Sequence, residues 1–173
     1  MDRVRRRAAL LLFATAALVY ALDRLTKLWA EHVLPGKPID VIPGILTLRY
    51  TTNSGGAFSL GQSAPWLFAA ATLVVAGLIL VTATRHTRIV TSAALGLVLG
   101  GALGNVTDRL ARGQGIVGGR VIDFIDLHVW PVFNLADASI VVGALLLAVW
   151  SWRGDRASTE PQTRHESSSS DDG

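Results

Sequence analysis

The sequence predicts an all-α membrane protein with four transmembrane helices and a small β-sheet or hairpin on the outer membrane surface. Half of its 173 residues are hydrophobic and the mean hydropathy is +0.42, a composition typical of membrane proteins. The apolar residues form four blocks, each close to the ~20 residues that a helix needs to cross a hydrocarbon core. Arginine residues gather at the ends of these blocks, where they orient a protein in a bilayer.

Basic residues flank the four predicted spans unevenly. The spans are expected at about residues 8–29, 65–84, 89–110 and 132–152. The flanking basic residues are Arg3, Arg5, Arg6, Arg7, Arg85, Arg88, Arg153 and Arg156. By the positive-inside rule they place the N-terminus, the loop between the second and third spans and the C-terminus on the cytoplasmic side. Four crossings return the chain to the side on which it starts, so the span count agrees with the charge distribution.

The first apolar block also has the features of a secretory signal peptide. An Arg-rich start and an apolar centre precede Val19-Tyr20-Ala21, which resembles a small-residue cleavage site. Removal of this block would leave three spans and would break the agreement between span count and charge. A retained first helix is therefore predicted.

The two predicted connections on the outer side differ in character. In the first, about residues 31–64, residues 45–51 have the β-branched and aromatic residues of a strand, and a turn at Asn53 leads to a second run at residues 57–60. The second, about residues 111–131, is glycine-rich and is expected to be a mobile loop. Its later part, residues 124–130, is expected to form a short interfacial segment with Trp130 at headgroup level.

The spans and their connections form one predicted membrane domain, residues 1–153. Residues 154–173 are rich in serine and charged side chains and carry no apolar run, so they are expected to form a disordered cytoplasmic tail.

Charge and residue usage exclude several classes of function. The net charge of +3 and the isoelectric point near 9.9 would suit a nucleic-acid-binding protein, but the arginines lie at span ends and no nucleic acid is expected as a partner. The absence of cysteine excludes disulfides, thiolate catalysis and cysteine-based metal sites. No metal or cofactor is expected, because the four histidines are scattered along the chain: His32, His86, His128 and His165.

The third predicted span carries polar residues where hydrocarbon disfavours them. Gly101, Asn105 and Asp108 are spaced four and three residues apart, so they share one helix face. Asn105 and Asp108 need polar partners at membrane depth, and the guanidinium of Arg109 is the expected partner of Asp108. A structural ion network near the interface is the alternative to a catalytic role for Asp108.

A glycine recurs at every fourth position of the same span. Gly96, Gly100 and Gly104 form this stripe, which is typical of helices that pack closely in a membrane. Close helix packing is the expected use of the stripe. A monomer is predicted, although the stripe itself leaves the oligomeric state open.

Two further carboxylates are expected at the same outer edge. Asp123 has apolar neighbours in the second outer connection, and Asp137 lies 14 residues later (137 − 123), near the start of the fourth span. Taken alone, Asp123 has the default interpretation of a solvated loop residue and Asp137 that of a helix-dipole partner, although Asn134 fits the capping position better. A loop of this length closes easily. Two carboxylates that converge on one water suit hydrolysis by acid–base catalysis.

The chain resembles lipoprotein signal peptidase, the bacterial signal peptidase II family, through several motifs in a fixed order. They are Asp23, Asn53-Ser54-Gly55-Gly56-Ala57-Phe58, Gly104-Asn105-Val106-Thr107-Asp108-Arg109, Val121-Ile122-Asp123-Phe124 and Phe133-Asn134-Leu135-Ala136-Asp137-Ala138-Ser139-Ile140. The resemblance covers about residues 8–152. Such a series around four spans is specific, whereas any one of these motifs alone would not be.

The resemblance implies an intramembrane aspartic endopeptidase of the bacterial cytoplasmic membrane, with both termini cytoplasmic and the active site near the outer face. Its substrates would be prolipoproteins whose lipobox cysteine bears diacylglycerol, cleaved on the N-terminal side of that cysteine. Its other ligands would be membrane lipid and globomycin-type inhibitors. The catalytic pair that activates a water would be Asp123 and Asp137.

The resemblance also implies roles for the polar residues around this pair. Residues expected to bind substrate are Asn53, Asn105, Arg109 and Asn134. Supporting roles are expected for Asp23 and Asp108, and for Gly101 on the same face as Asn105.

Two functions of other classes compete with the peptidase. A proton-coupled transporter or channel would use membrane carboxylates as a relay, but here the acidic motifs gather at one membrane face and no inverted repeat is evident. A non-catalytic scaffold would use the glycine stripe but would leave the carboxylates unexplained. Cleavage of a lipidated prolipoprotein separates the three.

Overall fold

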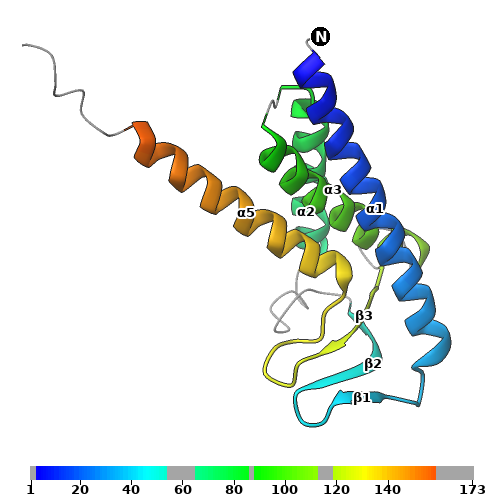
Figure 1. The fold of residues 1–173 in the computed structure, drawn as a ribbon. Helices are drawn as coiled ribbons and strands as arrows, with labels where there is room; N and C mark the ends of the chain where they lie inside the picture. The colour runs from blue at the N-terminus through cyan, green and yellow to red at the C-terminus, as the bar shows by residue number, and fades with distance from the viewer. Residues whose placement is uncertain (1–2, 54–64, 86–87, 113–118, 159–173) are drawn as a thin grey trace, which may run out of the picture.

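A computed structural model of the chain describes residues 3–53, 65–85, 88–112 and 119–158 (Figure 1). The described helices are α1 (Arg3–Val33), α2 (Pro65–Thr82), α3 (Ile89–Ala111) and α5 (Leu135–Ser158). The described strands are β1 (Ile39–Ile42), β2 (Leu46–Asn53) and β3 (Val121–Asp126). Figure 1 shows the strands at the end of the helices that lies away from the N-terminus.

The helices agree with a membrane protein. Within the described residues, three helices are long and apolar enough to cross a membrane: α1, α3 and residues 135–153 of α5. The shorter apolar stretch Ala70–Thr82 belongs to α2. The predicted spans therefore correspond to four helices, of which three are candidate spans.

Two helices differ in length from the predicted spans. α1 is continuous from Arg3 to Val33, through the sequence that resembles a cleavage site. α5 begins at Leu135, three residues later than predicted, and continues to Ser158, past the predicted start of the tail. The remainder of the predicted tail, residues 159–173, lies outside the described residues.

α3 is the central helix and packs against α1, α2 and α5. A Cβ on Gly96 or Gly100 would lie 2.6 Å from a backbone carbonyl oxygen of α1. A Cβ on Gly101 would lie 2.5 Å from the carbonyl oxygen of Ala136 in α5. The predicted packing role of the glycine stripe is therefore confirmed, and Gly101 opens a second close contact on the other side of α3.

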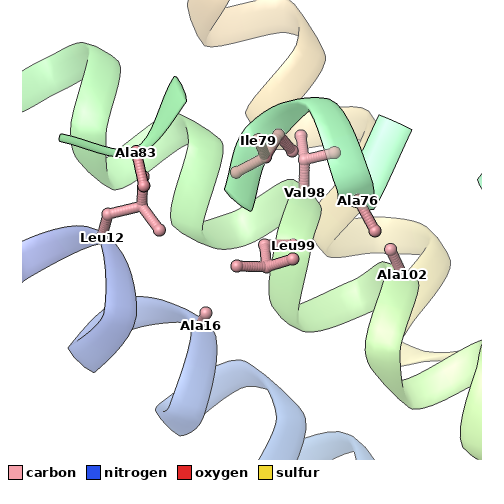
Figure 2. Close-up of a cluster of buried hydrophobic side chains, with 8 residues drawn as sticks. All are labelled: Leu12, Ala16, Ala76, Ile79, Ala83, Val98, Leu99 and Ala102. Atoms are coloured by element: carbon pink, nitrogen blue, oxygen red, sulfur yellow. The ribbon is translucent and has the colours of Figure 1, made fainter. Parts of the chain in front are cut away.

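The apolar core between the first three helices consists of small and branched side chains (Figure 2). Its members are Leu12 and Ala16 of α1, Ala76 and Ile79 of α2, Ala83, and Val98, Leu99 and Ala102 of α3.

α5 diverges from these helices over its C-terminal part (Figure 1). Its exposed apolar residues include Val141, Val142 and Leu145, as expected for a helix that faces lipid.

The three strands form one antiparallel sheet in the order β1-β2-β3. The strand predicted at residues 45–51 is confirmed as β2. It pairs with β1, a strand that precedes it along the chain and that the sequence did not predict. The second predicted run, residues 57–60, lies outside the described residues. The expectation that Asp123 lies in a loop is wrong, because residues 121–126 form β3, which pairs with β2 through Thr51↔Asp123 and Asn53↔Val121. Its apolar residues bury against the helices and the sheet, which a mobile loop cannot do.

The alternation of side chains along β3 determines which way Asp123 points. Ile122 and Phe124 form a buried cluster with Ala30 and Leu34 at the C-terminal end of α1. Since successive side chains of a strand point to opposite faces, Asp123 lies on the face away from this cluster. A one-residue shift in register would exchange the two sets, so the apolar anchors position the carboxylate.

Candidate active site

Five of the predicted site residues line one cavity of about 310 Å³. They are Asn53 of β2, Asn105 and Arg109 of α3, Asp123 of β3 and Asp137 of α5. Apolar side chains complete the walls, among them Val121, Phe133 and Ile140. Segments up to 84 residues apart in the sequence (137 − 53) thus bring their polar groups together beside an apolar surface.

Asp123 is held by two neutral amides. Its side chain is nearly buried, Asn134 Nδ2 donates a hydrogen bond to Asp123 Oδ1 at 2.7 Å, and the side chain of Asn53 also bonds to it. Burial and the nearby negative charge of Asp137 raise the pKa of Asp123 from 3.8 to about 7. This carboxyl therefore gives up its proton only as the pH rises through about 7, well above the range of an ordinary aspartate.

Asp137 and Asn134 cap the start of α5 reciprocally. Asn134 Oδ1 accepts a hydrogen bond from the backbone N–H of Asp137 at 2.9 Å, and Asp137 Oδ2 accepts one from the backbone N–H of Asn134 at 3.3 Å. This is a capping box, with Asn134 at the N-cap and Asp137 three residues later. The predicted capping role of Asn134 is confirmed. Since Asn134 Nδ2 also bonds to Asp123, one asparagine connects both carboxylates.

Asn105 lies between Asp137 and a buried lysine. Asn105 Nδ2 donates to Asp137 Oδ1 at 2.8 Å, and Lys27 Nζ donates to Asn105 Oδ1 at the same distance. Gly101, one turn before Asn105, is the close contact between α3 and α5 that brings Asn105 to Asp137.

The expected pairing of Asp108 with Arg109 is wrong. Asp108 is fully buried and pairs instead with Lys27 at 3.0 Å, with Arg24 and with Arg112 at 3.4 Å, and it also accepts from the backbone N–H of Ile122 at 3.3 Å. Adjacent residues of a helix point about 100° apart, so Asp108 faces α1 whereas Arg109 faces the cavity.

Arg109 is oriented toward the two carboxylates of the cavity. Its guanidinium donates to the carbonyl oxygen of Gly119 at 3.2 Å, and its charge acts on both Asp123 and Asp137. The predicted presence of Arg109 at the site thus agrees with the structure, although its partner differs from the expected one.

Asp23 connects α1 to the start of α5. Asp23 Oδ1 accepts from the backbone N–H of Ala136 at 3.0 Å, and Asp23 Oδ2 lies 2.9 Å from Lys27 Nζ. The buried network of Asp23, Lys27 and Asp108 therefore lies directly behind the cavity.

The sequence pattern did not draw attention to Lys27, which is the largest fully buried side chain. Its signal was present: Asp23 and Lys27 are spaced i, i+4 within an apolar span, so they share one helix face.

In the described part of the chain, no three His, Asp or Glu side chains come together in a way that could hold a metal ion.

Comparison with known proteins agrees with this geometry. The family described as Signal peptidase (SPase) II matches residues 15–153. A lipoprotein signal peptidase of Rhodococcus jostii (strain RHA1) is 44% identical over 151 residues, which cover 84% of this chain and 74% of the relative. A lipoprotein signal peptidase of Mycobacterium avium (strain 104) is 42% identical over 154 residues, which cover 87% of this chain and 82% of the relative.

Two solved structures share the fold, and both are of bacterial membrane enzymes studied by the in meso method. One has a TM-score of 0.75 at 24% identity and covers 88% of this chain and 94% of its own. The other has a TM-score of 0.67 at 27% identity and covers 81% of this chain and 91% of its own. With the family match over most of its length, the chain belongs to the signal peptidase II family and is a multi-pass membrane aspartic peptidase that removes signal peptides from prolipoproteins.

Proposed function

We propose that Asp123 and Asp137 are the catalytic pair of this peptidase. The observation that carries the proposal is the bridge through Asn134, whose side-chain amide bonds to Asp123 and which caps α5 together with Asp137. Both carboxylates line the same cavity, and Arg109 acts on both. Two carboxylates this closely linked share one proton more readily than they both ionise, which supplies an acid and a base at one place.

The hydrogen bonds suggest which carboxyl of the pair holds the shared proton. Both oxygens of Asp137 accept bonds from N–H donors, Asn105 Nδ2 and the backbone of Asn134, and such bonds favour a carboxylate. Asp123 would then hold the shared proton, in agreement with its pKa near 7.

In the proposed reaction, Asp137 removes a proton from water as the water oxygen bonds to the scissile carbonyl carbon. Asp123 gives its proton to the carbonyl oxygen. As the carbon–nitrogen bond of the tetrahedral diol breaks, Asp137 gives its proton to the leaving nitrogen and Asp123 takes a proton from one diol hydroxyl, so the single proton of the pair is again on Asp123. The products are a carboxylic acid and an amine, so one water is consumed for each bond cleaved.

We further propose that the remaining polar residues hold the substrate and the pair. Asn53 and Arg109 line the cavity and would bind the substrate backbone beside the scissile bond. Asn105 lines the cavity and would contact the substrate while it orients Asp137. Asn134, expected from the sequence to bind substrate, is fully buried and would instead orient both carboxylates. Asp23, Gly101 and Asp108 would support them by keeping α1, α3 and α5 in register.

The proposed substrate is a prolipoprotein whose cysteine carries diacylglycerol, cleaved on the N-terminal side of that cysteine. The apolar walls at Phe133, Ile140 and Val141 support this choice, because acyl chains can stay against them while the peptide bond reaches the carboxylates.

We propose four crossings, with α2 as the fourth, and both termini in the cytoplasm. The site then lies near the outer face, in a monomer that also binds globomycin-type inhibitors.

This proposal is tested with a lipidated precursor and the same precursor lacking diacylglycerol. In detergent, the lipidated form should be cleaved faster by roughly 100-fold or more, since remote binding energy raises the rate at the reacting bond. Mass spectrometry should locate the cut before the lipidated cysteine, and globomycin should block it. Equal cleavage of the two precursors would contradict the proposed substrate class.

The raised pKa of Asp123 predicts the pH dependence of cleavage. Because this pKa is about 7, the pair loses its shared proton as the pH rises through 7, and the rate should fall there. The sign for stability is the same: the folded state holds this proton more tightly than a carboxyl of pKa 3.8, so stability decreases as the pH rises toward 7. The measurement is the single-turnover rate on the lipidated precursor. A rate that stays constant between about pH 6 and about pH 8 would exclude Asp123 as the proton donor.

A further inference from the structure

Lys27 is enclosed by acceptors from two helices. Nothing of its side chain is exposed, and its ammonium lies 2.9 Å from Asp23 Oδ2, 3.0 Å from Asp108 Oδ2 and 2.8 Å from Asn105 Oδ1. The charge of the ammonium is balanced by carboxylates, of which Asp108 is shared with Arg24 and Arg112, whereas Asn105 is uncharged. The contact with Asn105 therefore contributes orientation and not charge balance.

The contact with Lys27 determines which end of the Asn105 amide faces the catalytic pair. An ammonium only donates hydrogen bonds, so the atom of Asn105 that faces it must be the carbonyl oxygen. The amide nitrogen is then turned toward Asp137, to which it donates at 2.8 Å. Asn134 Nδ2 also donates to Asn105 Oδ1, at 3.3 Å, so the ammonium is the closer and the charged one of two donors that fix this orientation. Without the ammonium, the amide would be held only by the longer bond from Asn134, and its nitrogen would be less firmly directed at Asp137.

We infer that Lys27 is a positioning residue for catalysis, which acts through Asn105 to keep Asp137 an acceptor of hydrogen bonds and to leave the shared proton on Asp123. The inference rests on the proposed roles of Asp123 and Asp137. Lys27 of α1 would thus orient the Asp137 carboxylate at the start of α5 through the side-chain amide of Asn105 in α3.

Arg24 provides a matched comparison within the same network. It is a cation on the same helix and also pairs with Asp108, but its side chain is 18% exposed. Within the described residues its hydrogen bond goes to Asp108 and not to Asn105. A residue that only stabilises the network should therefore behave like Arg24, whereas a positioning residue should not.

The first test is a double-mutant cycle of Lys27→Met and Asn105→Ala. Lys27→Met should lower kcat by roughly 10- to 100-fold with a smaller change in KM, because misplaced catalytic groups affect the chemical step. Arg24→Met should lower kcat much less than Lys27→Met does, because Asp108 keeps Lys27 and Arg112 as partners and the contact between Lys27 and Asn105 is untouched. If Lys27 acts through Asn105, the double variant loses no more activity than Asn105→Ala alone. Losses that multiply would overturn the inference.

The second test is the pH profile, which reports whether Lys27 acts on the catalytic pair at all, while the double-mutant cycle reports whether it does so through Asn105. The charged groups that face Asp123 are Asp137 from α5, Arg109 from α3 and Lys27 from α1, and the charge of Lys27 lowers the pKa of Asp123. Lys27→Met should therefore move the fall in rate to higher pH, whereas Arg24→Met should leave it in place. An unmoved profile for Lys27→Met would overturn the inference, even if Asn105→Ala is too slow to measure.

The inference and the proposed function fail in distinguishable ways. If Asp137→Asn cleaves normally, the catalytic pair itself is wrong. If Asp137→Asn is inactive while Lys27→Met behaves like Arg24→Met, only the positioning role of Lys27 is wrong. Thermal unfolding of each variant in detergent shows how much of any loss comes from the fold.

Discussion

Asp123→Asn and Asp137→Asn are each expected to abolish cleavage of a lipidated prolipoprotein, with rates lower by roughly 100- to 10,000-fold. Each substitution removes one half of the acid–base pair but keeps the size of the side chain. The pair then cannot both accept a proton from water and donate one to the substrate. Cleavage in detergent is the measurement, and the unfolding temperature should change little, since asparagine can retain part of the hydrogen bonding of either site.

Asp126→Asn is the matched control for this prediction. Asp126 belongs to the same strand as Asp123, but its carboxylate pairs with Arg49 at 2.5 Å and lies outside the residues that line the cavity. Only the Arg49 partner is largely exposed, and asparagine can still accept the hydrogen bond that Asp126 accepts from the backbone N–H of His128, so cleavage should stay near the wild-type rate. Normal turnover by Asp123→Asn or Asp137→Asn would refute the catalytic pair. An equal loss in Asp126→Asn would indicate damage to the sheet instead.

Gly101→Ala is expected to reduce both stability and activity. The new methyl group would lie 2.5 Å from the carbonyl oxygen of Ala136 and 2.8 Å from Ile140 Cγ1, and backbone cannot give way as a flexible side chain can. Overpacking of this kind costs about 1–3 kcal/mol. α5 would have to move away from α3, which would separate Asp137 from Asn105, so cleavage should fall by roughly 100-fold. The unfolding temperature and the cleavage rate in detergent measure the two effects.

Gly77→Ala is the control for the added methyl group. Gly77 lies in α2, and a Cβ there meets no heavy atom within 4 Å in the described part of the chain. Alanine is the better helix former, so this variant should be as stable as the wild type or slightly more so. If Gly101→Ala behaved in the same way, the close approach of α3 and α5 would not be needed for catalysis.

The helices were predictable because each apolar block is long and unbroken and lies between charged or turn residues. The start of α5 was misplaced by three residues because Val132 and Phe133 are apolar but lie before the cap at Asn134. Hydropathy alone does not separate apolar residues inside a helix from those just before it.

The sheet was only partly predictable. β2 could be anticipated from its own residues, but β3 pairs with it across more than sixty positions of sequence. Val121-Ile122-Asp123-Phe124 is short and carries a charge, and its strand character depends on burial against the end of α1. Context of this kind overrides local preference.

The site residues were anticipated as a set more successfully than as partners. Asn53, Asn105, Arg109, Asp123 and Asp137 do meet at one cavity. The partner of Asp108 was wrong because adjacency in sequence is not adjacency on a helix, and Lys27 was missed because its role exists only after α1 packs on α3.

The capping box at Asn134 has a consequence for how the enzyme would fail on heating. Helix ends fray before helix centres, and here the asparagine that caps the first turn of α5 also bonds to the two proposed catalytic carboxylates. Warming should therefore silence the peptidase while most of its helical circular dichroism remains. A ligand that occupies the cavity would stabilise this turn. It should therefore slow the loss of activity at temperatures below the unfolding temperature of the helix bundle.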